Sequence, residues 1–315
     1  MHVIDADRAH ALLDYPGLVE ALRELFRRGV DRLERAYLSQ PLPQGGSNDW
    51  LLLPAWQFGR NFGAKLVSIF PGNAAKGREA VLGIYALFDG ETGEPLAIID
   101  GAALTVRKTA ANSALAATYL AREDAARMVM VGAGAMAPHL IQAHCAVRPI
   151  REVRVWNRTP ERAERIAQGL TITGVRIEVT TDLERAVRWA DLVSCATMAT
   201  RPLVKGTWLK PGTHLDLVGG FRPDMREADD EAARRAKRHY IDTRITTVGV
   251  AGDITQPVEA GLIDPAALIE TGELARGEKP GRLDKEEVTF FKSGGGGHED
   301  LGTAQYLLHR LQSGG

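Results

Sequence analysis

The sequence has very little cysteine and no excess of charge of either sign. Its 315 residues include two cysteines, Cys145 and Cys195, which cannot build a disulfide framework or a Cys-x-x-Cys metal pair. Lysine and arginine number 39 against 40 aspartates and glutamates, so no basic surface for nucleic acid is expected. We therefore expect reduced thiols, no metal site and no nucleic-acid partner.

Long hydrophobic runs are also missing. No stretch reaches the roughly 18 apolar residues of a membrane span, so no membrane partner is expected. Residues 1–17 lack the basic and apolar segments of a signal peptide, which favours a cytoplasmic protein. Hydrophobic residues make up 44% and charged residues 25%, an ordinary globular balance in a chain long enough for two domains.

The first third of the chain has an α+β pattern. An apolar stripe predicts a helix over residues 5–35, capped by Asp5 or Asp7. A turn is predicted from Pro41 to Asp49. The strand-like runs that follow are Trp50 to Leu53, Phe62 to Phe70, Val81 to Phe88 and Pro95 to Ile99. Their spacing predicts antiparallel strands.

From about residue 101 the pattern changes to alternating helices and strands. An alanine-rich helix is predicted from Thr109 to Ala121, and a strand from Val153 to Arg158 is followed by a helix that Thr159 would cap. The same alternation continues towards the C-terminus. It predicts an α/β fold with a doubly wound parallel sheet.

The motif Gly-x-Gly-x-x-Ala at residues 132–137 is the strongest local signal. It follows a predicted strand, Met128 to Val131, and opens a predicted helix, Pro138 to Ala146. Gly132 permits a tight turn, and Gly134 lets the backbone approach a pyrophosphate at the helix N-terminus. We interpret the motif as a dinucleotide-binding loop; the alternative is a glycine-rich turn in a domain that binds no nucleotide.

The residues after the next strand indicate which dinucleotide binds. NAD enzymes usually place a carboxylate there to hold the ribose 2′-hydroxyl, whereas this chain has Asn157, Arg158 and Thr159. Amide, hydroxyl and guanidinium groups suit a 2′-phosphate, which a carboxylate would repel. We expect NADP(H) to be preferred, with NAD(H) possible. Alternatively, Arg158 is a solvated charge and Thr159 only a helix cap.

Several ordered segments together make the chain resemble the ornithine cyclodeaminase/μ-crystallin family over nearly its whole length. They are Gly63 to Asn73, Leu87 to Thr105, Lys108 to Ala116, Val131 to Ala137, Leu217 to Asp230 and Phe291 to Ala304. The resemblance implies a Rossmann domain at 115–292. It also implies a substrate-binding and dimerisation domain formed by 1–114 and 293–315, with two chains pairing through their first-domain sheets and active sites between the domains.

The resemblance also implies substrate contacts. Lys65 matches the family's substrate lysine, to which we assign carboxylate binding and a candidate role in proton supply; the alternative is a surface lysine on a strand. Lys108 occupies the position of the family residue that makes the second substrate contact. The guanidinium of Arg107 would nevertheless suit bidentate recognition of a carboxylate better. Pro43 occupies a position where family members with larger substrates often carry an arginine. Arg222 is a candidate to replace the carboxylate contact that such an arginine would make.

The remaining expected contacts come from residues near the predicted dinucleotide-binding loop and from the run of glycines at residues 294–297. The expected substrate-binding set is completed by Gly294, and the expected cofactor-binding residues are Thr109, Gly132, Gly134, Ala135, Met136, Asn157, Arg158, Thr159, Thr197, Val218, Gly219, Phe221 and Ser293. We expect His298 to be structural or solvated, with a proton relay as the alternative, and Asp300 either to cap the last helix or to face the site.

Phe221 separates the branches of the family. Ornithine cyclodeaminases resemble one another in having an aspartate here, and phenylalanine cannot exchange a proton, so that activity is disfavoured. The segment around it is similar to reductases of Δ1-pyrroline-2-carboxylate and Δ1-piperideine-2-carboxylate, which form L-proline and L-pipecolate. Such NADPH-dependent ketimine reduction is the leading hypothesis. The alternatives are an alanine dehydrogenase-like enzyme and a μ-crystallin-like small-ligand binder that retains NADPH.

Overall fold

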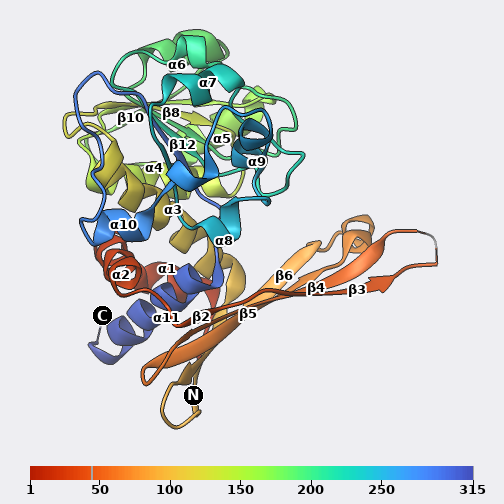
Figure 1. Ribbon diagram of the computed structural model, residues 1–315. Coiled ribbons are helices and arrows are strands. Elements are labelled where there is room, and N and C mark those ends of the chain that lie inside the picture. The colour runs from red at the N-terminus through yellow and green to blue at the C-terminus, as the bar shows by residue number, and fades with distance from the viewer. Residues whose placement is uncertain (44, 315) are drawn as a thin grey trace. The chain divides into compact units, whose positions relative to one another are not determined.

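The computed structural model describes residues 1–43 and 45–314, and its elements are labelled in Figure 1. The chain divides into two compact units. Unit 1 comprises residues 1–108 and 296–315, and unit 2 comprises residues 109–295. Both ends of the chain thus contribute to unit 1, as the predicted fold class requires.

Unit 1 is built on a mixed sheet. The strand order is β1-β7-β6-β5-β4-β2, and β3 pairs with β4. β1 runs parallel to β7, and the other neighbours are antiparallel. The strands are β1 His2–Ile4, β2 Arg32–Leu33, β3 Ala36–Pro41, β4 Ser47–Gln57, β5 Asn61–Ile69, β6 Val81–Asp89 and β7 Pro95–Asp100. A 3-10 helix, η1, spans Pro71–Lys76.

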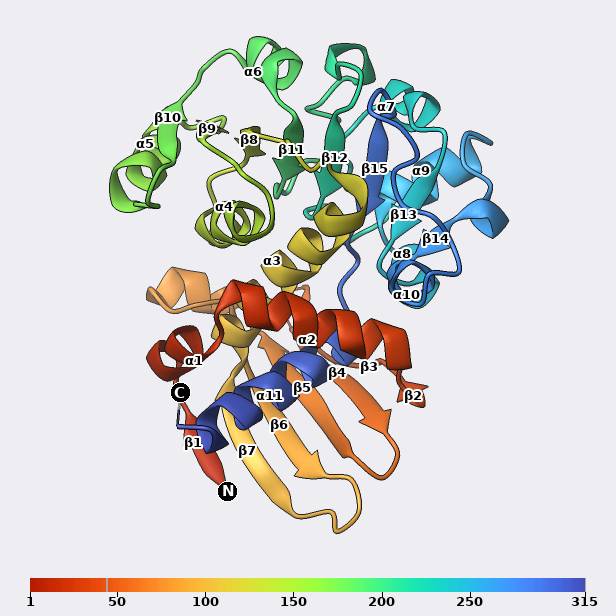
Figure 2. The ribbon, with the colours of Figure 1, turned by 90° about the vertical axis from the view of Figure 1, so that its left-hand side faces the viewer.

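Helices cover one face of this sheet, which we call the inner face (Figure 2). They are α1 Ala6–Leu12, α2 Tyr15–Arg28 and α11 Gly297–Gln312. The prediction of one helix over residues 5–35 was wrong, because Asp14 caps a second helix and Gly29 ends it. Asp5, one of the two predicted caps, accepts a hydrogen bond from the N–H of Arg8.

Strand β4 is longer than the sequence predicts, because it spans Ser47–Gln57 and not only Trp50 to Leu53. The predicted turn from Pro41 to Asp49 was too long, because Pro41 ends β3 and β4 begins at Ser47; Gln44 lies outside the described residues. Strand pairing between β3 and β4 satisfies the backbone groups of this segment, which local turn-forming residues do not reveal.

The opposite face of the sheet, here called the outer face, is apolar. Trp56, Phe62 and Phe88 stack in a row, with ring centroids 4.3 and 4.9 Å apart. The exposed members of the outer face are Val3, Leu38, Trp50, Trp56, Leu82 and Ile84. Exposed apolar patches of this kind mark interaction sites.

Unit 2 contains an eight-stranded sheet in which every described neighbour pair is parallel. The order is β10-β9-β8-β11-β12-β15-β13-β14. The strands are β8 Arg127–Val131, β9 Glu152–Trp156, β10 Arg176–Val179, β11 Leu192–Cys195, β12 His214–Leu217, β13 His239–Ile241, β14 Ile269–Glu270 and β15 Thr289–Lys292. This confirms the predicted α/β class, and the strand order reverses between β8 and β11.

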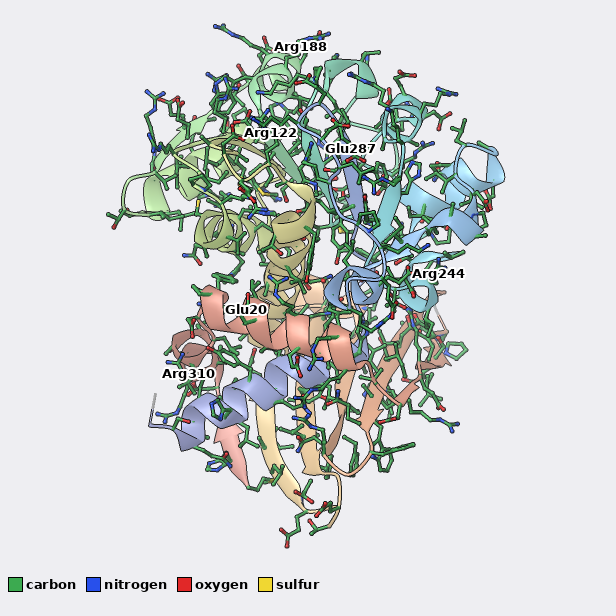
Figure 3. All side chains as sticks on the ribbon, turned by 60° about the vertical axis from the view of Figure 1, so that its left-hand side comes forward. Glu20, Arg122, Arg188, Arg244, Glu287 and Arg310 are labelled. Carbon is green, nitrogen blue, oxygen red and sulfur yellow. The ribbon has the colours of Figure 1, made fainter. Side chains whose placement is uncertain are left out.

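Helices surround this sheet. They are α4 Met136–Val147, α5 Pro160–Gly169, α6 Leu183–Trp189, α7 Asp230–Arg235, α8 Arg244–Thr247, α9 Gly252–Glu259 and α10 Thr271–Ala275, with short 3-10 turns η2 Gly206–Trp208 and η3 Pro265–Ala267. The alanine-rich helix α3 spans Gly101–Leu120 and so begins before the predicted Thr109. Charged side chains cover outward helix surfaces in both units, among them Glu20 and Arg188 (Figure 3).

One buried carboxylate ties together the amino ends of β8 and β11. Asp191 is 3% exposed and pairs with Arg127, Arg122 and Lys210 at 2.7–3.2 Å. It also accepts the backbone N–H groups of Ala126 and Arg127. Burial alone would raise the pKa of Asp191, but the hydrogen bonds from Arg127 and Lys210 outweigh burial and hold the pKa below its ordinary value.

We expect Asp191→Asn to lower the free energy of unfolding by about 3 kcal/mol, because it removes the buried anion that three partly exposed cations and two backbone N–H groups share. Asp124→Asn is the matched control, since Asp124 is exposed and pairs with the same Arg122; it should cost less than about 0.5 kcal/mol. Chemical denaturation of both variants measures the difference. Because the pKa of Asp191 is lowered, its contribution is present at neutral pH and is lost on acidification. Equal effects of the two substitutions would contradict this role.

Candidate functional site

The glycine-rich loop after β8 has the geometry that a dinucleotide requires. Gly132 has a φ of +108°, which only glycine adopts readily, and its N–H donates to Trp156 O at 2.8 Å. A Cβ built on Gly134 would meet no atom within 4 Å, so the backbone there faces open space. Helix α4 begins at Met136, earlier than the predicted Pro138, and no side chain caps it. The N–H of Ala137 donates to Gly134 O at 3.1 Å and Pro138 has no N–H, so the N–H groups of Ala135 and Met136 are the ones that can face an anion here.

The end of β9 braces this loop. The strand ends at Trp156, so the predicted extension to Arg158 was too long. Asn157 Oδ1 accepts the N–H of Ala133 at 3.2 Å, and Asn157 Nδ2 donates to Thr159 O at 2.8 Å. Asn157 thus orients the glycine loop, a contact that the sequence alone did not indicate.

Two guanidinium groups lie at the same place. Arg158 and Arg162 both line the pocket, and neither forms an ion pair within the described part of the chain. Thr159 occupies the N-cap position of α5, but its side chain makes no capping hydrogen bond, so its predicted role as a side-chain cap is wrong. Sequence reasoning missed Arg162, although it lies one helical turn beyond Arg158.

These groups form one pocket of about 270 Å³ at the carboxyl edge of the sheet. It lies where the strand order reverses, the usual position of a ligand in open α/β sheets. The lining residues are Gly132, Ala133, Gly134, Trp156, Asn157, Arg158, Thr159, Arg162, Ala196, Thr197, Met198, Ala199 and Leu203. The left-handed glycine, the open space at Gly134 and the uncapped helix fit a dinucleotide pyrophosphate.

Unit 1 contains a cluster of four buried charges. Lys65 lies on the inner face of β5, and its Nζ is 2.9 Å from Asp300 Oδ2. Lys108 Nζ is 2.8 Å from Glu299 Oε2 and 3.9 Å from Asp300 Oδ1. Exposed fractions are 6% and 3% for the lysines and 0% for the acids. Lys65 is therefore not a surface lysine, and two cations and two anions share one buried site.

This environment changes the acidity of the first lysine. Burial lowers the pKa of Lys65, Asp300 opposes that shift, and the like charge of Lys108 adds to it. A lysine with a lowered pKa releases its proton more readily than an exposed one. Lys65 can therefore supply a proton to a group bound beside it.

The structure separates the two basic residues that the sequence left as alternatives. Arg107 donates to His10 Nδ1 and to His10 O, both at 3.0 Å, and its guanidinium lies over the Tyr15 ring. Lys108, by contrast, joins Lys65 in the buried cluster. The geometry favours Lys108 as the second cation of the site.

The residues after β12 and β15 occupy different environments. Phe221 is exposed, and Arg222 is exposed and paired with Asp224. Ser293 is buried, where Asn112 Nδ2 donates to its Oγ. The N–H groups of Gly294 and Gly295 donate to Asp242 Oδ2 at 2.7 and 2.5 Å. Asp242 thus fixes the glycine run, a role that the sequence did not indicate.

Two other predicted residues lie within the final helix. Asp300 does not cap α11, because it lies inside the first turn and faces Lys65. His298 is buried and makes an edge-to-face ring contact with Phe26. Glu299 was missed; three consecutive ionisable residues after a glycine run were the available signal.

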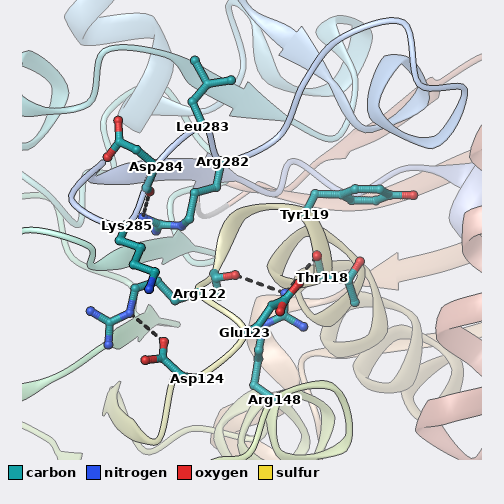
Figure 4. A pocket seen from close by; sticks show the side chains of 11 residues that line it. Thr118, Tyr119, Arg122, Glu123, Asp124, Arg148, Arg282, Leu283, Asp284 and Lys285 are labelled. Carbon is teal, nitrogen blue, oxygen red and sulfur yellow. Dashed lines mark hydrogen bonds and ion pairs between the residues drawn. The ribbon is translucent and has the colours of Figure 1, made fainter.

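A second pocket of unit 2, of about 460 Å³, has a structural explanation (Figure 4). Arg148 donates to the carbonyls of Ala117, Thr118 and Ala121 at the C-terminal end of α3. Arg282 donates to Leu120 O and Gly212 O. Its arginines therefore neutralise a helix C-terminus, and its position is away from the carboxyl edge of the sheet.

Within residues 1–43 and 45–314, no group of three or more His, Cys, Asp or Glu side chains is arranged to hold a metal ion. Over the same residues, no helix combines the length and apolar character needed to cross a membrane. The functional candidates are the glycine loop of unit 2 and, separately, the buried charges of unit 1.

The parallel sheet, its strand order and the glycine loop define a Rossmann-type α/β protein with a second, mixed-sheet unit. The sequence profile of the ornithine cyclodeaminase/mu-crystallin family matches residues 15–315, and the chain belongs to that family.

Individual relatives cover almost the whole chain. The Δ1-pyrroline-2-carboxylate reductase of Paracoccus denitrificans is 40% identical over 299 residues, which cover 94% of this chain and 92% of the relative. The structure of the Thermococcus litoralis Δ1-pyrroline-2-carboxylate reductase in complex with NADH and L-proline is similar with a TM-score of 0.89 at 30% identity, covering 100% and 98% of the two chains. An archaeal alanine dehydrogenase dimer with bound NAD gives a TM-score of 0.88 at 27% identity, covering 100% and 97%.

Proposed function

We propose that this protein is an NAD(P)H-dependent oxidoreductase acting on C–N bonds, which reduces a small cyclic ketimine carboxylate. The substrates are Δ1-pyrroline-2-carboxylate or Δ1-piperideine-2-carboxylate, and the products are L-proline or L-pipecolate. The observation that carries the proposal is the buried cluster in which Lys65 and Lys108 lie together. The similarity of the whole chain to two Δ1-pyrroline-2-carboxylate reductases supports the same reaction.

The chain's own groups have distinct tasks in this reaction. The N–H groups around Gly134 and at the start of α4 hold the pyrophosphate of the nicotinamide cofactor. When bound, the reduced nicotinamide supplies a hydride to the substrate's C2 carbon. Lys65 and Lys108 hold the substrate carboxylate, and Lys65 is the candidate donor of the proton that the ring nitrogen needs.

Phe221 supports the proposal of a ketimine over an open-chain diamino acid such as ornithine. Cyclodeamination needs an acid/base group at the position of Phe221, whose side chain cannot exchange protons. A ketimine requires only an anion contact, one proton and one hydride. The residues present satisfy the first two needs, and the cofactor satisfies the third.

Turnover with purified protein tests the function directly. We expect NADPH oxidation with at least one of the two cyclic ketimines, and less with pyruvate plus ammonia, which is the alanine dehydrogenase alternative. Lys65→Met should lower kcat/KM by at least about 100-fold while leaving nucleotide binding intact, because it removes a charge and a proton donor. Absence of NADPH and NADH oxidation with every cyclic ketimine would rule out the proposal.

We further propose that NADP(H) is preferred over NAD(H). Arg158, Arg162 and the Thr159 hydroxyl lie together without a carboxylate at the end of β9, which suits a 2′-phosphate. Arg158→Ala should weaken NADPH binding about tenfold or more and NADH binding much less. Titration of the variant and the parent with both reduced nucleotides measures this, and an equal loss for both nucleotides contradicts the preference.

We propose that two copies of the chain associate through the outer face. Val3, Trp50 and Ile84 are 77%, 43% and 42% exposed there, and a face this apolar needs a cover. A second copy satisfies the requirement by symmetry, because the same face meets itself in a two-fold pair. The likeness to an archaeal alanine dehydrogenase dimer supports this assembly.

We expect Ile84→Glu to shift the sedimenting species from a dimer towards the 34.2 kDa single chain, because the new charge would be buried between copies. Leu283→Glu is the matched control, since Leu283 is 67% exposed and lies in unit 2. Sedimentation velocity on the parent protein and both variants measures whether each sediments as a dimer or as a single chain. A monomeric parent protein, or a dimeric Ile84→Glu variant, argues against this interface.

A further inference from the structure

A second group of buried charges lies in unit 2, and none of its members has a role in the reaction proposed above. Glu227, Asp253 and Lys292 are 0%, 1% and 0% exposed. Lys292 belongs to β15, Asp253 to the first turn of α9, and their charged atoms are 3.7 Å apart. Three ionisable groups without solvent are costly to bury, so each needs a structural reason.

Glu227 has a specific set of partners. Its Oε1 accepts the N–H of Thr197 at 2.6 Å and the Thr197 hydroxyl at 2.8 Å. Its Oε2 accepts the N–H of Gly219 at 2.7 Å. Thr197 follows β11 and Gly219 follows β12, so one carboxylate joins the loops at the ends of two neighbouring strands.

The glycines after β12 show how tightly this contact is built. A Cβ on Gly219 would lie 2.1 Å from Thr197 O and 2.4 Å from Glu227 Oε1. A Cβ on Gly220 would lie 2.7 Å from Asp253 Oδ2. No side chain fits at Gly219 without displacing the carboxylate, so the loop is shaped around it.

Glu227 is itself held in place. Asp253 Oδ1 accepts the N–H groups of Glu227 and Ala228 at 2.8 and 3.2 Å. The backbone of Glu227 also accepts the N–H groups of the loop beyond Thr197, from Leu203 and Val204. The backbone that carries the Glu227 carboxylate is therefore held in place, as are the groups to which the carboxylate binds.

We propose that Glu227 is a positioning residue for the nicotinamide dinucleotide. Its ionised carboxylate clamps the loops that follow β11 and β12, so that Thr197 and the residues around Gly219 present a fixed edge to the cofactor. Glu227 does not touch the cofactor itself. The inference rests on the proposed dinucleotide binding, and Thr197 connects the two because it lines the dinucleotide pocket.

The clamp should depend on pH. Burial raises the pKa of Glu227 to about 7, Lys292 opposes that shift, and Asp253 adds to it. Cys195 of β11 and Asp216 of β12 are the other titratable groups around this cluster. Protonation turns one acceptor oxygen into a donor, so at least one of the three contacts weakens as the pH falls through about 7. Nucleotide binding is therefore expected to tighten as the pH rises through this value.

The same shift has the opposite sign for stability. Because the pKa is raised in the folded protein, the folded state holds the proton more strongly than the unfolded chain. The contribution of Glu227 to the free energy of unfolding is fully present at low pH and declines as the pH rises through about 7. Binding and stability thus move in opposite directions, which distinguishes the clamp from a purely structural role.

The test compares Glu227→Gln with Glu259→Gln, which makes the same chemical change on an exposed side chain of α9. Affinities for NADPH and NADH are measured by nicotinamide fluorescence across the pH range that brackets about 7. At the alkaline end of the range, Glu227→Gln should weaken the binding of both nucleotides about tenfold. The reason is that the amide N–H of the new glutamine would face a backbone N–H, which is also a donor. Its affinity should lack the pH dependence of the parent, and KM for the nucleotide should change more than kcat.

Parental affinity and pH profile in Glu227→Gln would overturn the clamp and leave the proposed function standing. Failure of the parent protein to bind either nucleotide would instead overturn the proposed function. Thr197→Val is a second variant in case Glu227→Gln does not fold, because it deletes one hydroxyl donor and keeps the backbone contact. A loss of about threefold or more with Thr197→Val that shrinks as the pH falls below about 7 supports the clamp, and unchanged affinity or a loss that does not depend on pH overturns it.

Discussion

Backbone N–H groups that no strand or helix can satisfy are accepted in unit 2 by buried carboxylates. Asp191 accepts those of Ala126 and Arg127, and Asp242 accepts those of Gly294 and Gly295. Glu227 does the same for Thr197 and Gly219. A charged acceptor makes a stronger hydrogen bond than a carbonyl, and a buried N–H without an acceptor is costly. The loops of a parallel sheet are therefore held by long-range side chains, and the position of any loop ligand depends on them.

In unit 1 the alternation of β5 reverses the usual arrangement of a half-buried strand. Phe62, Ala64 and Leu66 point to the outer face, whereas Lys65 points under the helices. A lysine on the covered face is stable only with a counter-charge, which Asp300 provides from α11. Among the residues that the structure describes, the exposed apolar side chains of the outer face are left without a cover. Burial of the lysine and exposure of the apolar face are thus linked consequences of one strand pattern.

The sequence predicted those features that arise within a short stretch of chain. The glycine motif, its flanking strand and the parallel α/β fold follow from local spacing, and the structure confirms the fold. The division of residues 5–35 into two helices was missed because Asp14 and Gly29 act as a cap and a stop only in context. The partners of Lys65 were beyond local reasoning, since Asp300 lies 235 positions away. Glu227 gave no signal either, because an acidic residue in a polar segment is normally a solvated one.

The cofactor preference that we propose depends on one position where this chain departs from the usual pattern of NAD enzymes. A carboxylate at the end of the second strand serves two hydroxyls of an NAD ribose but repels a 2′-phosphate. Asn157 occupies that position, and its amide oxygen and one amide N–H both form hydrogen bonds with nearby backbone groups. It therefore contributes shape without charge, and the positive charge beside it comes from Arg158 and Arg162. If NADP(H) is preferred as proposed, added attraction to the 2′-phosphate sets that preference.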